Sequence, residues 1–152
     1  MFEQFWNSET VQEAIEILYT DMPLALWETL YATVLSTFFA IVLGLPLGVL
    51  LVAGEKDGVR PLPRWLMQVL NILINLLRSI PFLILMIMVI PLTRLIVGTS
   101  VGTMASVVPL VIAAFPFVAR LVESSLREVN PNIIEAAQSM GASPMQIICK
   151  VM

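Results

Sequence analysis

Residues 29–54 read T-L-Y-A-T-V-L-S-T-F-F-A-I-V-L-G-L-P-L-G-V-L-L-V-A-G, a run of 26 residues without a charged side chain. About 20 consecutive apolar residues in a helix cross the hydrocarbon core of a bilayer, so this run is long enough for a span. Residues 95–119 form a second uncharged run, of 25 residues. Only 12% of the chain is charged, against roughly 25% in ordinary soluble domains. The sequence therefore predicts an all-α integral membrane protein.

The first span is predicted to run from residue 29 to residue 52. It carries Ala40, Gly44 and Gly48 at four-residue intervals, with Pro46 between the glycines. Small residues at this spacing let a neighbouring helix approach closely. Proline removes a backbone N–H and should kink the helix. A packing seam that also bends and ordinary small-residue packing both fit this pattern.

The second apolar region, residues 65–93, contains one charge, Arg78. A straight helix of 29 residues would be about 43 Å long, which exceeds the roughly 30 Å of the hydrocarbon core. We therefore expect a break at Pro81, with a tilted helix before it near the cytoplasmic surface and an outward span over 82–96. Since an arginine at the bilayer centre is expensive, Arg78 is expected to mark the inner boundary of that span.

A third span is predicted over residues 103–119, after an outer loop at 98–102. It contains Pro109 and Pro116, which indicate either a helix opened toward a cavity or irregular packing against protein. The helix is expected to continue beyond the span with a charged, solvated face formed by Arg120, Glu123, Arg127 and Glu128. Glu123 and Arg127 have favourable i,i+4 spacing for an ion pair.

The distribution of charge predicts the orientation of these spans. Residues 1–28 hold six acids and no lysine or arginine, whereas the loop 54–64 holds Lys56, Arg60 and Arg64. Basic loops stay in the cytoplasm, so the N-terminus is expected outside and residues 54–64 inside. Three crossings then leave residues 121–152 in the cytoplasm. A short helix over 10–19, broken at Pro23, is expected to lie along the outer surface.

The end of the chain, residues 130–152, reads N-P-N-I-I-E-A-A-Q-S-M-G-A-S-P-M-Q-I-I-C-K-V-M. Asn130 can cap a helix that begins at a proline, and Gly141 can take the left-handed conformation that ends it. Ser143 and Gln146 have the spacing of a capping box for a second short helix. The sequence predicts a helical hairpin whose first helix carries one apolar side, formed by Ile133, Ala136, Ala137 and Met140.

The hairpin sequence Glu135-Ala136-Ala137, three residues and Gly141 resembles the EAA loop of permease subunits in bacterial binding-protein-dependent ABC importers. The sequence R-S-I-P-F at 78–82 is similar to the same family, and residues 90–100 and 135–146 look closest to methionine-type amino-acid permeases. The resemblance divides the chain into an acidic extracytoplasmic segment, 1–28, and an importer transmembrane domain, 29–152. That domain looks incomplete at its C-terminus, because the family continues with Leu-Pro and two further spans.

The resemblance implies a multi-pass permease of the bacterial inner membrane that works as a homodimer with cytoplasmic ABC ATPase subunits and an extracytoplasmic substrate-binding protein. Its substrate would be an amino acid, methionine or a relative. The residues that would couple to the ATPase are Glu135, Ala136, Ala137, Met140, Gly141, Pro144 and Met145. Helix kinks or packing are assigned to Gly44, Pro46, Gly48, Arg78, Pro81, Pro109 and Pro116.

Several other classes of function are disfavoured by the residues. The chain has no histidine, one cysteine and no G-x-x-x-x-G-K-[ST] sequence, which excludes a His/Cys metal site and a phosphate-binding loop. We therefore expect no metal, no cofactor and no enzymatic activity of its own. There is no basic patch for nucleic acid. Residues 29–54 and 79–122 hold no carboxylate, which argues against an ion-coupled carrier. A membrane fragment that inserts or assembles without transporting remains the alternative.

Overall fold

The computed structural model describes residues 9–56 and 58–151, and all the regular secondary structure in this part of the chain is helical. Residues 1–8 of the acidic segment and residue 57 of the basic loop lie outside the described residues. In chain order the helices are α2 (Glu9–Ala53), α3 (Arg64–Ser79), α4 (Phe82–Val97), α5 (Thr103–Arg127), α6 (Pro131–Ser139) and α7 (Pro144–Lys150). The predicted all-α membrane fold is confirmed.

The number of membrane crossings depends on how one bent pair of helices is counted. Within the described residues, Val11–Ala53 and Thr103–Arg127 are each long and apolar enough to span a bilayer. Helices α3 and α4 meet that test only together, and they are bent by 115° at their junction. With 16 residues, α4 is about 24 Å long, shorter than the hydrocarbon core. The outward span predicted over 82–96 is therefore long enough only when α3 and α4 are counted as one broken span.

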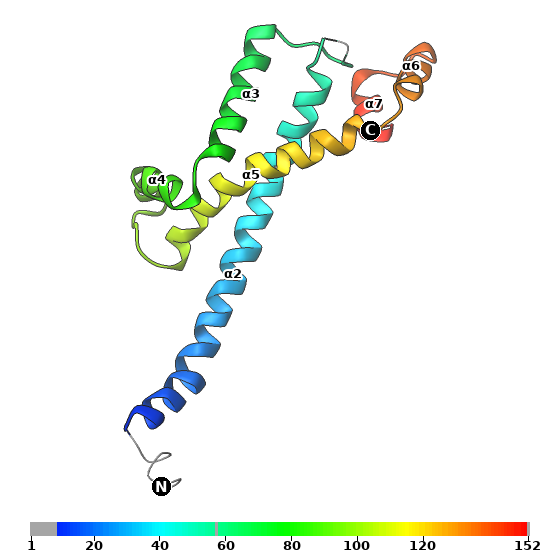
Figure 1. Ribbon diagram of the computed structural model, residues 1–152. Coiled ribbons are helices and arrows are strands. Elements are labelled where there is room, and N and C mark those ends of the chain that lie inside the picture. The colour runs from blue at the N-terminus through cyan, green and yellow to red at the C-terminus, as the bar shows by residue number, and fades with distance from the viewer. Residues whose placement is uncertain (1–8, 57, 152) are drawn as a thin grey trace.

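The long helix α2 is the axis around which the other helices are placed. Figure 1 shows α3, α5 and the α6–α7 hairpin gathered around its C-terminal half, while its N-terminal part projects alone. The hairpin and the loop that joins α2 to α3 lie at the same end of the molecule. Helix α3 returns from that end toward the middle of α2 rather than lying flat across it (Figure 1).

Helices α2 and α5 pack with their backbones in close approach. A Cβ atom on Gly44 would lie 2.7 Å from Val118 Cβ, and one on Gly48 would lie 2.6 Å from the Ala119 carbonyl oxygen. Ala119 and Ala40 are almost completely buried. The small side chains on α2 therefore bring it against α5 of the same chain. Such close packing matters most in a bilayer, because apolar side chains gain little free energy by moving from lipid to a helix surface.

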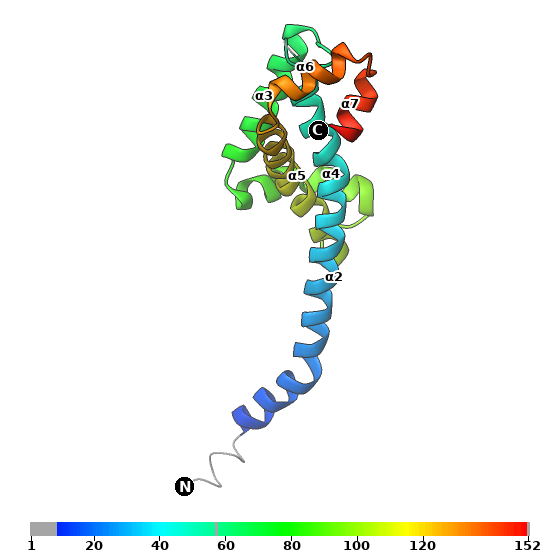
Figure 2. The same ribbon diagram turned by 90° about the vertical axis from the view of Figure 1, so that its right-hand side faces the viewer.

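The expected helix break at Pro23 is wrong. Helix α2 runs through both Pro23 and Pro46 without interruption, although Figure 2 shows that it curves in its N-terminal part. An interior proline removes one backbone hydrogen bond and displaces one carbonyl, whereas the flanking apolar residues keep all of theirs. Helix α5 is likewise continuous through Pro109 and Pro116, and both prolines are buried. Their burial favours the packing interpretation over an opened helix.

The predicted solvated face of α5 is wrong at Glu123, which is buried, whereas Arg127 and Glu128 are exposed as expected. The Glu123 carboxylate accepts a hydrogen bond from Arg120 on one oxygen, at 2.5 Å, and from Arg127 on the other, at 2.9 Å. The i,i+4 pair that the spacing indicated does form, but only 8% of the Glu123 side chain is exposed. A buried carboxylate requires such compensation, since its desolvation penalty is large.

The two arginines also reach other segments. Nη2 of Arg120 donates to Asn71 Oδ1 at 2.8 Å and to Asn75 Oδ1 at 3.0 Å, both on α3. Nη2 of Arg127 pairs with Glu55, which lies two residues after the end of α2. We call Glu55, Asn71, Asn75, Arg120, Glu123 and Arg127 the polar cluster. Nε of Arg120 is buried and has no partner within the described residues, which costs on the order of 1–3 kcal/mol.

We predict that replacing Gly48 with valine separates α2 from α5. The added atoms would meet the Ala119 carbonyl oxygen and Val122 at less than 3 Å, and overpacking of this kind costs about 1–3 kcal/mol. The thermal unfolding midpoint of the detergent-purified protein should fall. Ala25→Val, at an exposed position of the same helix, should leave the midpoint unchanged, and equal midpoints for both variants would contradict the proposed packing.

A second prediction concerns the polar cluster. Glu123→Ala leaves the part-buried Arg120 without its carboxylate, and breaking a buried ion pair in this way costs about 3–5 kcal/mol. Glu55→Ala removes only an exposed partner of Arg127, for which we expect about 1 kcal/mol or less. Unfolding free energies measured in denaturant should therefore differ strongly between the two variants. A similar loss in both would show that burial of Glu123 does not decide its contribution.

Candidate functional site

The hairpin formed by α6 and α7 begins and ends at capped positions. The Asn130 side chain accepts a hydrogen bond from the Asn132 backbone N–H at 3.0 Å, and Pro131 opens α6. At the other end Gly141 has φ +79°, and the Ala142 N–H donates to the Ala137 carbonyl at 3.1 Å. With the Gly141–Gln138 bond at 2.9 Å, these contacts form a Schellman motif, which fixes the turn between the helices.

Helix α7 is held at its start by a reciprocal pair of side-chain contacts. The Ser143 N–H donates to Gln146 Oε1 at 2.8 Å, and the Gln146 N–H donates to Ser143 Oγ at 3.4 Å. Isolated helices this short are unstable in water, so packing has to contribute. The Ile147 side chain supplies it, being 1% exposed. The shape of the hairpin is thus fixed by the caps of its two helices and by the buried side chain of Ile147.

The hairpin rests on the end of α2 and on the loop that follows it. A groove of about 510 Å³ is lined by Leu50 and Leu62 on one side and by Met145 and Ile148 of the hairpin on the other. A smaller groove of about 220 Å³ is lined by Ile134 of α6 together with residues before and after the end of α2 and at the end of α5, among them Val52, Val59 and Leu126. Both grooves place the hairpin over the junction of α2, its following loop and the end of α5.

Most of the predicted coupling residues are exposed, although Met145 also lines the groove beside α2. Ala137 is buried, whereas the other members are exposed: Glu135, Ala136, Met140, Gly141, Pro144 and Met145. Met140 and Met145 are 82% and 71% exposed. The apolar side predicted for α6 therefore lies mostly open, since only Ala137 of its four residues turns inward. The result is an exposed surface of methionine, alanine and proline with one carboxylate.

Exposed methionines are suited to contact with another protein surface. Their unbranched thioether chains adapt to an irregular partner and are found at binding surfaces for that reason. Open apolar surface on a monomer also marks sites of interaction. Around Gly141 an added Cβ would meet nothing within 4 Å, so the space beside the turn is free. The hairpin can thus receive a partner without rearranging.

The residues assigned to kinks or packing lie apart from this surface. Gly44 and Gly48 lie against α5, and Pro46 lies inside α2. Arg78 is exposed in the last turn of α3, and Pro81 caps the start of α4. Pro109 and Pro116 are buried within α5. None of these seven residues belongs to the hairpin.

Sequence reasoning missed the role of two asparagines. In the sequence Asn71 and Asn75 are only polar interruptions of the apolar run 65–93, whereas in the structure both accept from Arg120. Their four-residue spacing places them on the same face of a helix, and this is a signal that the sequence contains. The partner could not be read from it, because 45 and 49 residues separate the asparagines from Arg120.

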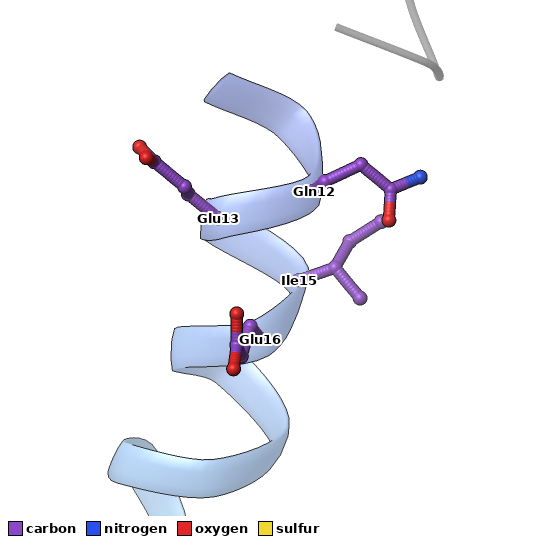
Figure 3. Close-up of a pocket in the computed structure, with 4 residues that line it drawn as sticks. All are labelled: Gln12, Glu13, Ile15 and Glu16. Carbon is purple, nitrogen blue, oxygen red and sulfur yellow. The ribbon is translucent and has the colours of Figure 1, made fainter. Parts of the chain in front are cut away.

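A hollow near the start of α2 does not qualify as a second site. Figure 3 shows the four residues that line it, Gln12, Glu13, Ile15 and Glu16, on one helix. Glu13 points away from Gln12 and Ile15 (Figure 3). The four side chains therefore do not converge on a common point.

Comparison with known proteins finds relatives among membrane transport components. Residues 44–152 match the family described as "Binding-protein-dependent transport system inner membrane component". The chain is 52% identical over 129 residues to the probable D-methionine transport system permease protein MetI of Vibrio cholerae, which covers 84% of this chain and 56% of the relative. It is 48% identical over 126 residues to the D-methionine transport system permease protein MetI of Escherichia coli K12.

Among solved structures, the chain is similar to one titled "Inward facing conformations of the MetNI methionine ABC transporter". The TM-score is 0.78 at 48% identity, over 82% of this chain and 57% of that one. The chain thus spans somewhat more than half the length of the relatives it matches. With a family match over residues 44–152 and an all-helical membrane fold, this chain belongs to the family of binding-protein-dependent transport system inner membrane components.

Proposed function

We propose that this chain provides the permease part of an ATP-driven ABC importer for an amino acid, D- or L-methionine or a related compound. Its α6–α7 hairpin is the coupling element, which docks on a separate ATPase subunit. The exposed surface around Glu135, Met140 and Met145 on a capped hairpin carries this proposal. The names of the MetI relatives support the class of substrate.

The physical argument for docking rests on the stiffness of the hairpin. Because both helices are capped and Ile147 is buried, a force applied at Met140 would reach the end of α5 without being absorbed by melting of α6. Glu135 adds a charge near the contact, which favours a partner with a basic residue at that place. An ATPase closing on nucleotide would apply such a force.

The assembly and orientation belong to the same proposal. Two copies of the permease pair with two ATPase subunits, and an extracytoplasmic binding protein delivers the substrate. The N-terminus lies outside, while residues 54–64 and 121–152 lie in the cytoplasm of a bacterium, below its inner membrane. The support for this orientation is the charge asymmetry between residues 1–28 and the basic loop.

A membrane fragment that inserts or assembles without transporting is the second candidate. The chain spans 56–58% of the length of the two MetI relatives. Reconstitution of the chain with ATPase and binding protein separates the two functions. ATP-dependent methionine uptake favours the permease, and normal insertion without uptake favours the fragment.

We predict that Gly141→Val and Glu135→Lys each abolish copurification with the ATPase subunit of a methionine ABC transporter. Valine strains the turn, since Gly141 has φ +79°, and lysine reverses the charge beside the contact. Gly98→Val is the matched control, because Gly98 has φ +82° and equally open surroundings but lies between α4 and α5. Retention of the ATPase by both hairpin variants would remove the docking proposal.

The orientation is tested with the natural cysteine. Cys149 is the one cysteine of the chain and is exposed on α7, so a membrane-impermeant maleimide should react with it only after spheroplasts are permeabilised. In the Cys149→Ser, Thr99→Cys variant the thiol lies in the loop before α5 and should react in intact spheroplasts. Labelling of Cys149 in intact spheroplasts would reverse the proposed orientation.

A further inference from the structure

We infer that the polar cluster acts as a strut, through which α3 and the end of α2 follow the hairpin when it moves. This inference rests on the proposed function, because the ATPase supplies the movement. Arg120 and Arg127 are the positioning residues, and both reach from α5 to another segment. The strut would carry displacement from the hairpin to the bent pair of helices, α3 and α4.

The contact with α3 has a geometry that resists sliding. One nitrogen of Arg120 donates to Asn71 and to Asn75, one helical turn apart. The opposite nitrogen is fixed by Glu123, whose side chain is 8% exposed. A planar guanidinium held on both sides has few alternative positions. Hydrogen bonds among part-buried groups are also stronger than in water. The contact therefore sets the register of α3 against α5.

Apolar packing between α3 and α5 gives less restraint. Ile74 is the only residue of α3 that is buried in the described chain. Exposed apolar side chains cover much of the rest of α3: Trp65, Val69, Ile72, Leu73 and Leu76. Such side chains contact lipid or protein without preferring one register. The asparagine contacts are thus what ties the position of α3 to that of α5.

The contact with Glu55 joins the strut to the surface on which the hairpin rests. Arg127 lies three residues before Asn130, the cap of α6. Its Nη2 binds Glu55 and Glu123 at once. Glu55 and Arg127 also line the groove that Ile134 of the hairpin enters. A displacement of α6 would therefore move the polar cluster, because Arg127 lies within one helical turn of the start of α6.

Removing the acceptors on α3 tests the strut without touching the hairpin. Asn71→Leu combined with Asn75→Leu keeps the side-chain size and removes both bonds to Arg120. The complex with ATPase and binding protein should form as before, because the docking surface is intact. Methionine uptake per ATP hydrolysed in proteoliposomes should fall about fivefold or more, within the range of coupling between linked sites.

Gln68→Leu is the matched control, since Gln68 is exposed one turn earlier on α3 and its side chain makes no hydrogen bond within the described residues. Uptake per ATP in this variant should equal that of the parent. The same ratio in the double variant would overturn the strut. Where the double variant fails to insert, Asn75→Leu alone carries the test, because Asn75 is exposed and one acceptor then remains.

A distance measurement tests the strut separately from the proposed function. Spin labels at Val69→Cys and Gln138→Cys, both exposed, are placed in a Cys149→Ser background. The chain in nanodiscs should give a narrow distance distribution, and the asparagine double variant a broad one. Equal widths would overturn the strut. Failure of the parent to bind the ATPase would instead remove the proposed function and leave this result standing.

Discussion

The close approach of α2 and α5 at Gly44 and Gly48 is the constraint on which the rest of the structure depends. In lipid the apolar surfaces of two helices gain little by meeting, so association requires many short contacts between atoms. Because Gly44 and Gly48 have no side chains, the backbone of α2 comes close enough to make such contacts with Val118, Ala119 and Val122. Once α5 is fixed against α2, its two ends are fixed as well. One end lies at Glu28, which accepts from Thr103 at 2.9 Å, and the other carries the hairpin.

The polar cluster restricts how α2, α3 and α5 can slide or rotate relative to one another. Apolar contact alone allows helices to slide or rotate at small cost, whereas the Glu123 carboxylate, 8% exposed, tolerates only arrangements that keep both arginines beside it. The desolvation of these charges opposes folding, so the cluster need not stabilise the protein relative to an apolar replacement. Its effect is to favour one arrangement of the helices over its neighbours. Such specificity is what a moving assembly requires.

Most of what the sequence predicts correctly depends on local signals. The apolar runs, the Asn130 and Ser143 caps and the turn at Gly141 each involve residues within a few positions of one another, so their chemistry is readable without a tertiary structure. The expected break at Pro23 failed because proline's local cost was weighed without the long helix that continues on both sides of it. Glu123 was expected in solvent because helix periodicity shows which residues share one side of a helix, but not which other segments pack against that side. Asn71 and Arg120 meet only through the fold.

The hairpin and α5 differ in how they are stabilised, and this difference bears on mechanism. The hairpin is held by caps and by a few buried residues such as Ile147, so it can keep its shape while its position changes. Helix α5 is held along its length by α2 and by charges at its end. Between them lie only Glu128, Val129 and Asn130, with backbone bonds that close the end of α5, as in Val129 N–H to the Leu126 carbonyl at 3.3 Å. A short, bonded connection of this kind transmits displacement rather than absorbing it. Movement of the hairpin is therefore felt first where α5 meets α3 and the end of α2. Helix α3, with Ile74 as its one buried residue in the described chain, has little apolar packing to resist it.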